Sequence, residues 1–213
     1  MKPVADLAAC ASAHRALLVE VDAFDDTDMR RPSLLPGWTI AHVCTHLARN
    51  ADSHVHRFAA AGRGEMVDQY AGGLAGRAAE IEAGTARDAA TIIADVRGTI
   101  AAFAAAADAV PDDAWECASR DARGAIRPAW ELPLRRWQEV EVHRVDFGRG
   151  YSHREWTDAF LDRLIPLVRE KLPERLAPGT PIPSLVDINE RDVLAWWYDR
   201  LEIDGLPALQ PYG

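Results

Sequence analysis

The sequence of 213 residues has few of the features of a secreted or membrane protein. Its three cysteines, Cys10, Cys44 and Cys117, form no C-x-x-C pair. This number and spacing exclude a disulfide framework and a thiolate zinc knuckle, and they favour a reducing compartment. No apolar run approaches the roughly 18 residues of a membrane-spanning helix, and the amino terminus lacks the apolar core of a signal peptide. We therefore expect a cytoplasmic protein without a membrane partner.

Clusters of basic residues are also missing. The net charge is −9, and the doublets Arg30-Arg31 and Arg135-Arg136 stand alone in the sequence. Nucleic acids and anionic membranes repel an acidic surface that has no basic patch. We therefore expect a small molecule as the partner and exclude nucleic acid, while the sequence gives no indication of the oligomeric state.

Apolar residues recur at helical spacing through most of the first 150 residues. This periodicity predicts four helices, at residues 4–25, 40–61 with Thr39 as N-cap, 74–107 with a bend or division at Gly84, and 128–147. Residues 119–127 form either an exposed hairpin or a plain loop. Because short connections favour antiparallel neighbours, we expect a four-helix bundle in residues 1–150.

Residues 151–213 have a different character, with prolines at positions 173, 178, 181 and 183. The pattern predicts a helix at 157–172 that Pro166 interrupts, a last helix at 192–201, and one short strand at 184–188. The fold class is therefore mainly α, with a bundle domain at 1–150 and a small C-terminal region at 151–213.

Two segments far apart in the chain carry metal-binding side chains at helical spacing. His42 and His46 stand four residues apart, as do Glu139 and His143, so each pair shares one face of a helix. Facing helices with such pairs build divalent metal sites in bundle cores, and zinc suits imidazoles with one carboxylate and an open fourth position. The same spacing is also common in surface pairs worth only a few tenths of a kcal/mol. The spacing alone leaves both interpretations open.

The neighbours of these residues favour the metal interpretation. Glu139 and His143 alternate with valines, and His46 lies among apolar residues of its helix. Buried carboxylate and imidazole groups are costly unless they are paired or bind a metal. Glu141 lies about 200° around the helix from Glu139 and is predicted to be solvated. The other histidines are expected to be ordinary core or surface residues; they are His14, His54, His56 and His153.

Four stretches carry a resemblance to a known family. They are residues 35–52 (LPGWTIAHVCTHLARNAD), 136–148 (RWQEVEVHRVDFG), 72–84 (GGLAGRAAEIEAG) and 206–212 (LPALQPY). The first two resemble the metal-binding signatures of the mycothiol-dependent maleylpyruvate isomerase family, which belongs to the DinB-like bundle superfamily. The third is similar to the family's third-helix region, and the fourth to its usual ending. The resemblance implies a DinB-like four-helix bundle with a small C-terminal α/β appendage, short enough here for part of its sheet to be missing.

The resemblance also implies the site. The ligands of Zn²⁺, or of another divalent metal, would be His46, Glu139 and His143, and His42 would be a pocket neighbour on the same helix face. Asn50, one turn beyond His46, would orient a bound group or else be a helix-surface amide. An arginine near the end of the family's last helix meets the substrate carboxylate; Arg200 occupies the comparable place here.

The activity implied is an isomerisation that uses the thiol of mycothiol as a nucleophile. The thiolate adds to an electron-poor cis double bond, the resulting single bond rotates, and elimination gives the trans product. The protein's own Cys44 faces away from the ligands and is expected to be a small core residue. Two alternatives remain: a mycothiol S-transferase that conjugates an electrophile at the same metal site, and a non-catalytic bundle with structural zinc, closed by His42 as a fourth protein ligand.

Overall fold

The computed structural model describes residues 1–211, so Tyr212 of the closing stretch lies outside the described residues. The chain forms two compact units, Met1–Gly148 and Arg149–Gly213. The first unit contains α1 (Val4–Val21), α2 (Asp26–Met29), α3 (Ile40–Gly62), α4 (Gly73–Gly84), α5 (Ala89–Asp108), η1 (Asp112–Glu116), β1 (Ala118–Arg120), β2 (Ile126–Pro128), η2 (Ala129–Glu131) and α6 (Leu132–Asp146). The second contains η3 (His153–Glu155), α7 (Asp158–Lys171), η4 (Leu172–Arg175) and α8 (Glu190–Trp197). The mainly α fold class is confirmed.

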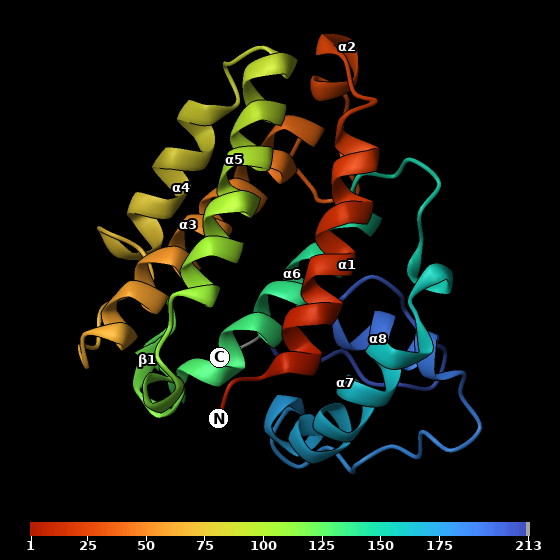
Figure 1. The fold of residues 1–213 in the computed structure, drawn as a ribbon. Coiled ribbons are helices and arrows are strands. Elements are labelled where there is room, and N and C mark those ends of the chain that lie inside the picture. The colour runs from red at the N-terminus through yellow and green to blue at the C-terminus, as the bar shows by residue number, and fades with distance from the viewer. Residues whose placement is uncertain (212–213) are drawn as a thin grey trace. The chain divides into compact units, whose positions relative to one another are not determined.

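The first unit is a bundle of α1, α3, α5 and α6 (Figure 1). Helix α3 packs against α5, α4 and α6, while α1 packs mainly against α6. The core of the first unit is apolar and includes the fully buried residues Leu17, Val43, Leu47 and Val140. Since α3 contacts three other helices, its side chains reach the centre of the bundle.

Local signals in the sequence explain where α3 begins. Thr39 is the N-cap, and the third helical residue, His42, completes a reciprocal capping box with it. Such a box satisfies backbone N–H groups that have no partner within the helix. The predicted start is therefore correct, and the start fixes the register in which His46 faces inward.

The helix predicted at 74–107 is divided into α4 and α5 after Gly84. Asp88 begins α5 by accepting a hydrogen bond from the backbone N–H of Thr91 at 2.7 Å. A Cβ atom on Gly84 would lie 2.4 Å from Cγ2 of Thr45 on α3, closer than real carbon contacts allow. Glycine at this position therefore lets the end of α4 approach α3 directly.

Helix α5 is rich in alanine and other apolar residues. By length and mean hydropathy, 1.4 over 18 residues, it could cross a membrane. In the bundle, however, one face packs against α3 and buries Ile92, Val96 and Phe103. A single helix of this length and composition is weak evidence for a membrane segment.

The strands of the described residues form one antiparallel hairpin, β1 with β2, which pairs Ser119 with Arg127. This is the hairpin alternative for residues 119–127. The strand predicted at 184–188 is wrong: the chain there has turns and bends, and residues 149–211 contain no strand. A strand needs a partner ladder, and Pro181 and Pro183 remove donors just before the segment.

Helix α7 continues through Pro166, so the predicted interruption is also wrong. Pro166 lies on the exposed side of the helix. The carbonyl that loses its helical hydrogen bond there faces solvent, where water can replace the bond. Trp196 and Trp197 of α8 are buried.

Candidate metal centre

Three side chains from α3 and α6 converge on one point. The Nε2 atom of His46 lies 2.9 Å from Oε2 of Glu139 and 3.0 Å from Nε2 of His143. The third distance, from Nε2 of His143 to the same Glu139 oxygen, is 3.4 Å. These residues are the only described group of three or more histidine, cysteine or acidic side chains whose ligand atoms meet in this way.

The geometry of the three atoms fits a divalent metal. Ligand atoms about 2.0–2.1 Å from a tetrahedral zinc lie about 3.3 Å apart, close to the three distances observed. Two imidazole nitrogens and one carboxylate oxygen are a donor set that zinc accepts in sites with an open position. His46 is buried, whereas the Glu139 side chain is 35% exposed. The centre is therefore accessible from the Glu139 side.

Neighbouring residues fix the orientation of both histidines. Nδ1 of His143 lies 2.7 Å from Oδ2 of Asp146, a fully buried carboxylate one turn further along α6. A proton on Nδ1 bound to this carboxylate leaves the lone pair of Nε2 directed at the centre, as is usual for metal-binding histidines. The ring of Trp38 packs on His46 with 5.8 Å between centroids.

The electrostatics of the site favour a neutral His46 and an ionised Glu139. Burial, and secondarily the charge of His143, lowers the pKa of His46 to about 4. Burial by itself would raise the pKa of Glu139, but hydrogen bonds from His143 and His46 hold it well below its usual value. Burial would lower the pKa of His143, and its bonds to Asp146 and Glu139 raise it instead. A carboxylate and an uncharged imidazole are the forms that bind metals.

His42 lies beside this group but is not part of it. Its Nδ1 atom is 2.8 Å from the hydroxyl of Thr39, and its Nε2 atom is 3.2 Å from Oε2 of Glu82. Its ring stacks on Trp38. Both ring nitrogens of His42 are therefore engaged away from the three converging atoms.

The other two residues predicted for the site have different surroundings. Asn50 is buried on α3, and its Oδ1 atom accepts a hydrogen bond from Nη1 of Arg136 at 2.9 Å. It is therefore not a helix-surface amide. Arg200 belongs to the second unit, just after α8, and its guanidinium donates to the carbonyl of Tyr198.

The prediction that Glu141 is solvated is wrong, because this carboxylate is buried and pairs with Nη1 of Arg144 at 3.1 Å. The face of α6 opposite the metal ligands packs against α1. A side chain on that face, such as Glu141, is therefore buried and not exposed to solvent. Cys44 is fully buried, as expected, and burial raises the pKa of its thiol.

Sequence reasoning missed three arginines near the centre. Nη2 of Arg77 on α4 lies 2.9 Å from Nδ1 of His46. Arg136, one turn before Glu139, is fully buried and donates to His14, Asn50 and the carbonyl of Leu47. The third, Arg57, is buried on α3 against Ser53 and His54. Arg136 stands three residues from Glu139, a spacing that could have indicated it; nothing local in the sequence indicated Arg57 or Arg77.

These three arginines have no carboxylate partner among residues 1–211. Burial lowers the pKa of Arg57 to about 10 and also lowers the pKa of Arg136, while the charge of Glu139 acts in the opposite direction on both. Buried cations are normally paired with anions. The centre therefore combines a possible cation site with positive charge that is not neutralised by neighbouring carboxylates.

Comparison with known proteins identifies the family of this chain. The model of the mycothiol maleylpyruvate isomerase N-terminal domain matches residues 10–148. A crystal structure of the mycothiol-dependent maleylpyruvate isomerase is 20% identical with a TM-score of 0.82, over 94% of this chain and 90% of that one, and a histidine-to-alanine mutant of it gives the same values. No curated protein matches the sequence. The structural likeness establishes a shared fold, and the family match establishes that this chain belongs to the mycothiol maleylpyruvate isomerase N-terminal domain family.

Proposed function

We propose that this protein is a zinc- and mycothiol-dependent isomerase of the maleylpyruvate type. The observation that carries the proposal is the convergence of His46, Glu139 and His143 within a chain of this family. Similar proteins are described as mycothiol-dependent maleylpyruvate isomerases, which makes an unsaturated dicarboxylate of that kind the first substrate to test.

The three converging residues would hold the metal, and Asp146 would keep His143 in the tautomer that binds it. When bound, the metal would supply a Lewis acid that lowers the pKa of a thiol, so that the thiolate forms near neutral pH. The engagement of both ring nitrogens of His42 supports an open fourth position in preference to a closed structural site.

The reaction needs only one thiol for many turnovers. When bound, mycothiol would supply the thiolate nucleophile for a reversible addition to the cis double bond, and it would be recovered unchanged when elimination gives the trans product. The positive charge of Arg57, Arg77 and Arg136 is suited to a doubly charged substrate and to the enolate-like charge that develops on it.

The remaining predicted site residues have roles that fit this scheme. Asn50 accepts a hydrogen bond from Nη1 of Arg136 and would orient that guanidinium. Asn50 would therefore act on a bound group through Arg136. His42, stacked on Trp38, would line the thiol side of the centre. Arg200 would bind a substrate carboxylate, as the resemblance implies.

Thiol stoichiometry tests the proposal. Purified protein is loaded with zinc, its metal content is measured, and maleylpyruvate is supplied in large excess over mycothiol. An isomerase consumes substrate far beyond the amount of thiol and leaves the thiol unchanged. Product equal to the thiol added, with a stable conjugate, would make the protein an S-transferase. Absence of bound metal, or turnover that does not depend on thiol, would overturn the proposal.

A further inference from the structure

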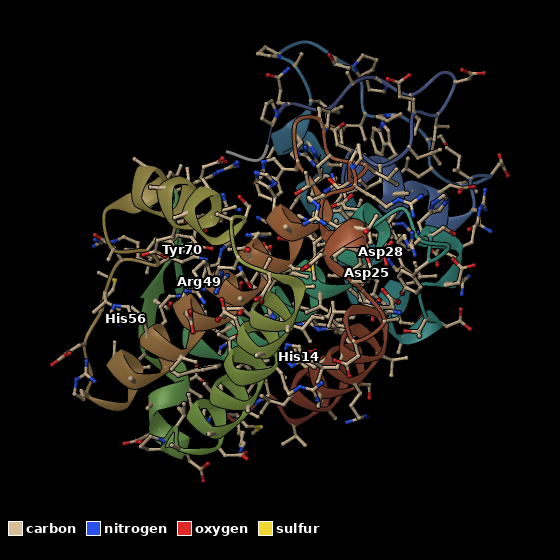
Figure 2. The ribbon with its side chains drawn as sticks, turned by 90° about the horizontal axis from the view of Figure 1, so that it is seen from above. His14, Asp25, Asp28, Arg49, His56 and Tyr70 are labelled. Atoms are coloured by element: carbon tan, nitrogen blue, oxygen red, sulfur yellow. The ribbon has the colours of Figure 1, made fainter. Side chains whose placement is uncertain are left out.

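Arg77 makes an unusual contact for a residue beside a metal site. Its Nη2 atom lies 2.9 Å from Nδ1 of His46, on the side of the ring opposite the centre. Its guanidinium also lies over the ring of Tyr70, which Figure 2 labels in the loop before α4, at 5.8 Å from the ring centroid. A metal-binding histidine normally has an acceptor at this second nitrogen, such as a carboxylate or a carbonyl.

The contact dictates where the proton of His46 resides. An arginine side chain carries only N–H donors and stays charged, so Nδ1 of His46 must be the acceptor. A neutral imidazole that accepts at Nδ1 carries its proton on Nε2. That proton then points at Oε2 of Glu139 and Nε2 of His143, which lie at 2.9 and 3.0 Å. The two acceptors share this one proton, while Nδ1 accepts from Arg77.

The same proton excludes a metal. A ligand must offer a lone pair, so coordination through Nε2 of His46 requires the proton to move to Nδ1. An N–H group at Nδ1 would then face the N–H group of Arg77, and two donors at 2.9 Å repel each other. The Arg77 contact and metal binding at His46 are therefore mutually exclusive.

Of the three arginines near the centre, Arg77 makes the fewest hydrogen bonds, one against two for Arg57 and three for Arg136. Arg136 is fixed by three acceptors, and Arg49 and Arg87 are held by Asp95. Arg77 has no ion pair in the described chain, and its helix buries only Ile81 and Gly84. Gly72 precedes the helix and Gly73 begins it, both at positive φ. Little packing resists a change in the Arg77 side chain.

We propose that Arg77 is a displaceable cap on His46: it stabilises the metal-free tautomer, leaves when a divalent cation binds, and then presents its guanidinium to the anionic ligand of the loaded centre. This rests on the proposed metal site. In this scheme Arg77, a positioning residue on α4, lowers the metal affinity of the protein. Its guanidinium becomes available to a substrate carboxylate only when the metal is bound.

Zinc affinity without thiol or substrate tests this role. We compare wild type with Arg77→Met, which removes the donors, and Arg77→Gln, whose amide oxygen can accept from Nδ1–H of the metal-bound ring. The expected order of affinity is Gln tightest, then Met, then wild type, with about a tenfold gain or more for Gln. Arg87→Met is the matched control, because Arg87 is paired with Asp95, and should bind zinc as wild type does.

Each alternative outcome overturns the proposal. Equal gains for Met and Gln would mean that only the charge of Arg77 matters, and unchanged affinity in both would mean that it has no role. Nitrogen-15 NMR of the zinc-free wild type should show His46 protonated at Nε2; protonation at Nδ1 would contradict the contact. Should wild type bind no zinc at all, the proposed function fails, while the NMR tautomer still decides whether Arg77 caps His46.

Discussion

At the scale of single residues, the first unit contains a buried guanidinium, that of Arg136, whose hydrogen-bond acceptors are all uncharged groups. Arg136 has no exposed surface, and its Nε atom donates to Nε2 of His14 at 3.0 Å. Because a guanidinium only donates, His14 on α1 must accept and must remain uncharged. The sequence suggested an ordinary histidine here, since the partner lies 122 residues away and no spacing rule links the two.

Acid should therefore weaken the fold through His14. Burial, with the charge of Arg136, lowers the pKa of His14 to about 2, whereas the unfolded chain titrates at about 6.5. The unfolded state binds more protons below that value, so stability is complete above about pH 6.5 and falls as the pH decreases, by up to about 1.4 kcal/mol per pH unit. His14→Gln, which can still accept from Arg136, should make urea-unfolding free energies depend less on pH between 7 and 5.

His56 provides the control for this measurement. It is exposed on α3, whereas His14 lies in the bundle, and both are labelled in Figure 2. His56→Gln should leave the pH dependence of the unfolding free energy as it is in wild type. An equal slope in wild type and His14→Gln would mean that His14 is not held neutral in the folded protein.

At the scale of elements, α6 has two charged faces with different tasks. Glu139 faces the metal centre, whereas Glu141 faces α1 and pairs with Arg144, which also binds Glu20. Helical periodicity assigned the two glutamates to separate faces correctly. It could not show that a second helix covers the other face, because the sequence does not specify which neighbour packs there.

Glu139→Gln and Glu141→Gln should therefore change different properties, the first zinc affinity and the second the free energy of unfolding. The first replaces a carboxylate ligand with a neutral amide and should lower zinc affinity at least about tenfold. The second weakens a buried ion pair and should cost about 1–2 kcal/mol of unfolding free energy, with wild-type zinc content. Metal analysis and urea unfolding measure both. Loss of zinc in Glu141→Gln would show that the two faces are coupled.

The close approach of α4 to α3 gives a second element-scale prediction. Gly84→Ala would place a methyl group 2.4 Å from Cγ2 of Thr45, so we expect a loss of about 1–3 kcal/mol in unfolding free energy. The double variant Gly84→Ala/Thr45→Ala removes the opposing atoms and should recover much of this loss. Equal stabilities of the single and double variants would contradict a direct clash.

The limits of sequence reasoning are clear at this scale. The start of α3 at Thr39 and the break at Gly84 follow from capping and glycine, which act within a few residues. The strand predicted at 184–188 failed because a strand depends on a partner elsewhere in the chain. The metal ligands were suggested by spacing within each helix, but their identity needed the family resemblance. The Arg77 contact depends on how α4 packs, which no local pattern encodes.

At the scale of the whole molecule, the chemistry is divided unevenly between the two units. The three converging residues, together with Arg77 and Asp146, all belong to Met1–Gly148. Arg200 belongs to Arg149–Gly213. The proposed metal ligands and the proposed carboxylate-binding Arg200 therefore belong to different units of the chain.

A fragment of residues 1–148 tests this division. It should bind zinc with the affinity of the full chain, because every ligand and its hydrogen-bond partner are present, and it should lose most thiol-dependent turnover, because Arg200 is missing. Zinc titration and a turnover assay on the same sample measure the two properties, with circular dichroism to verify that the fragment is helical. A helical fragment that binds zinc poorly would contradict the assignment of all ligands to the first unit.

His46 and Glu139 lie 93 positions apart in the chain, so the proposed ion would link two distant segments as well as take part in the reaction. A cation shared by α3 and α6 would join segments whose meeting costs considerable chain entropy, and it would bind the folded chain far better than the unfolded one. The free energy of unfolding would then depend on the concentration of free zinc: at one hundred times the dissociation constant the gain is about 2.7 kcal/mol. A chelator would then both silence this protein and hasten its turnover by proteases.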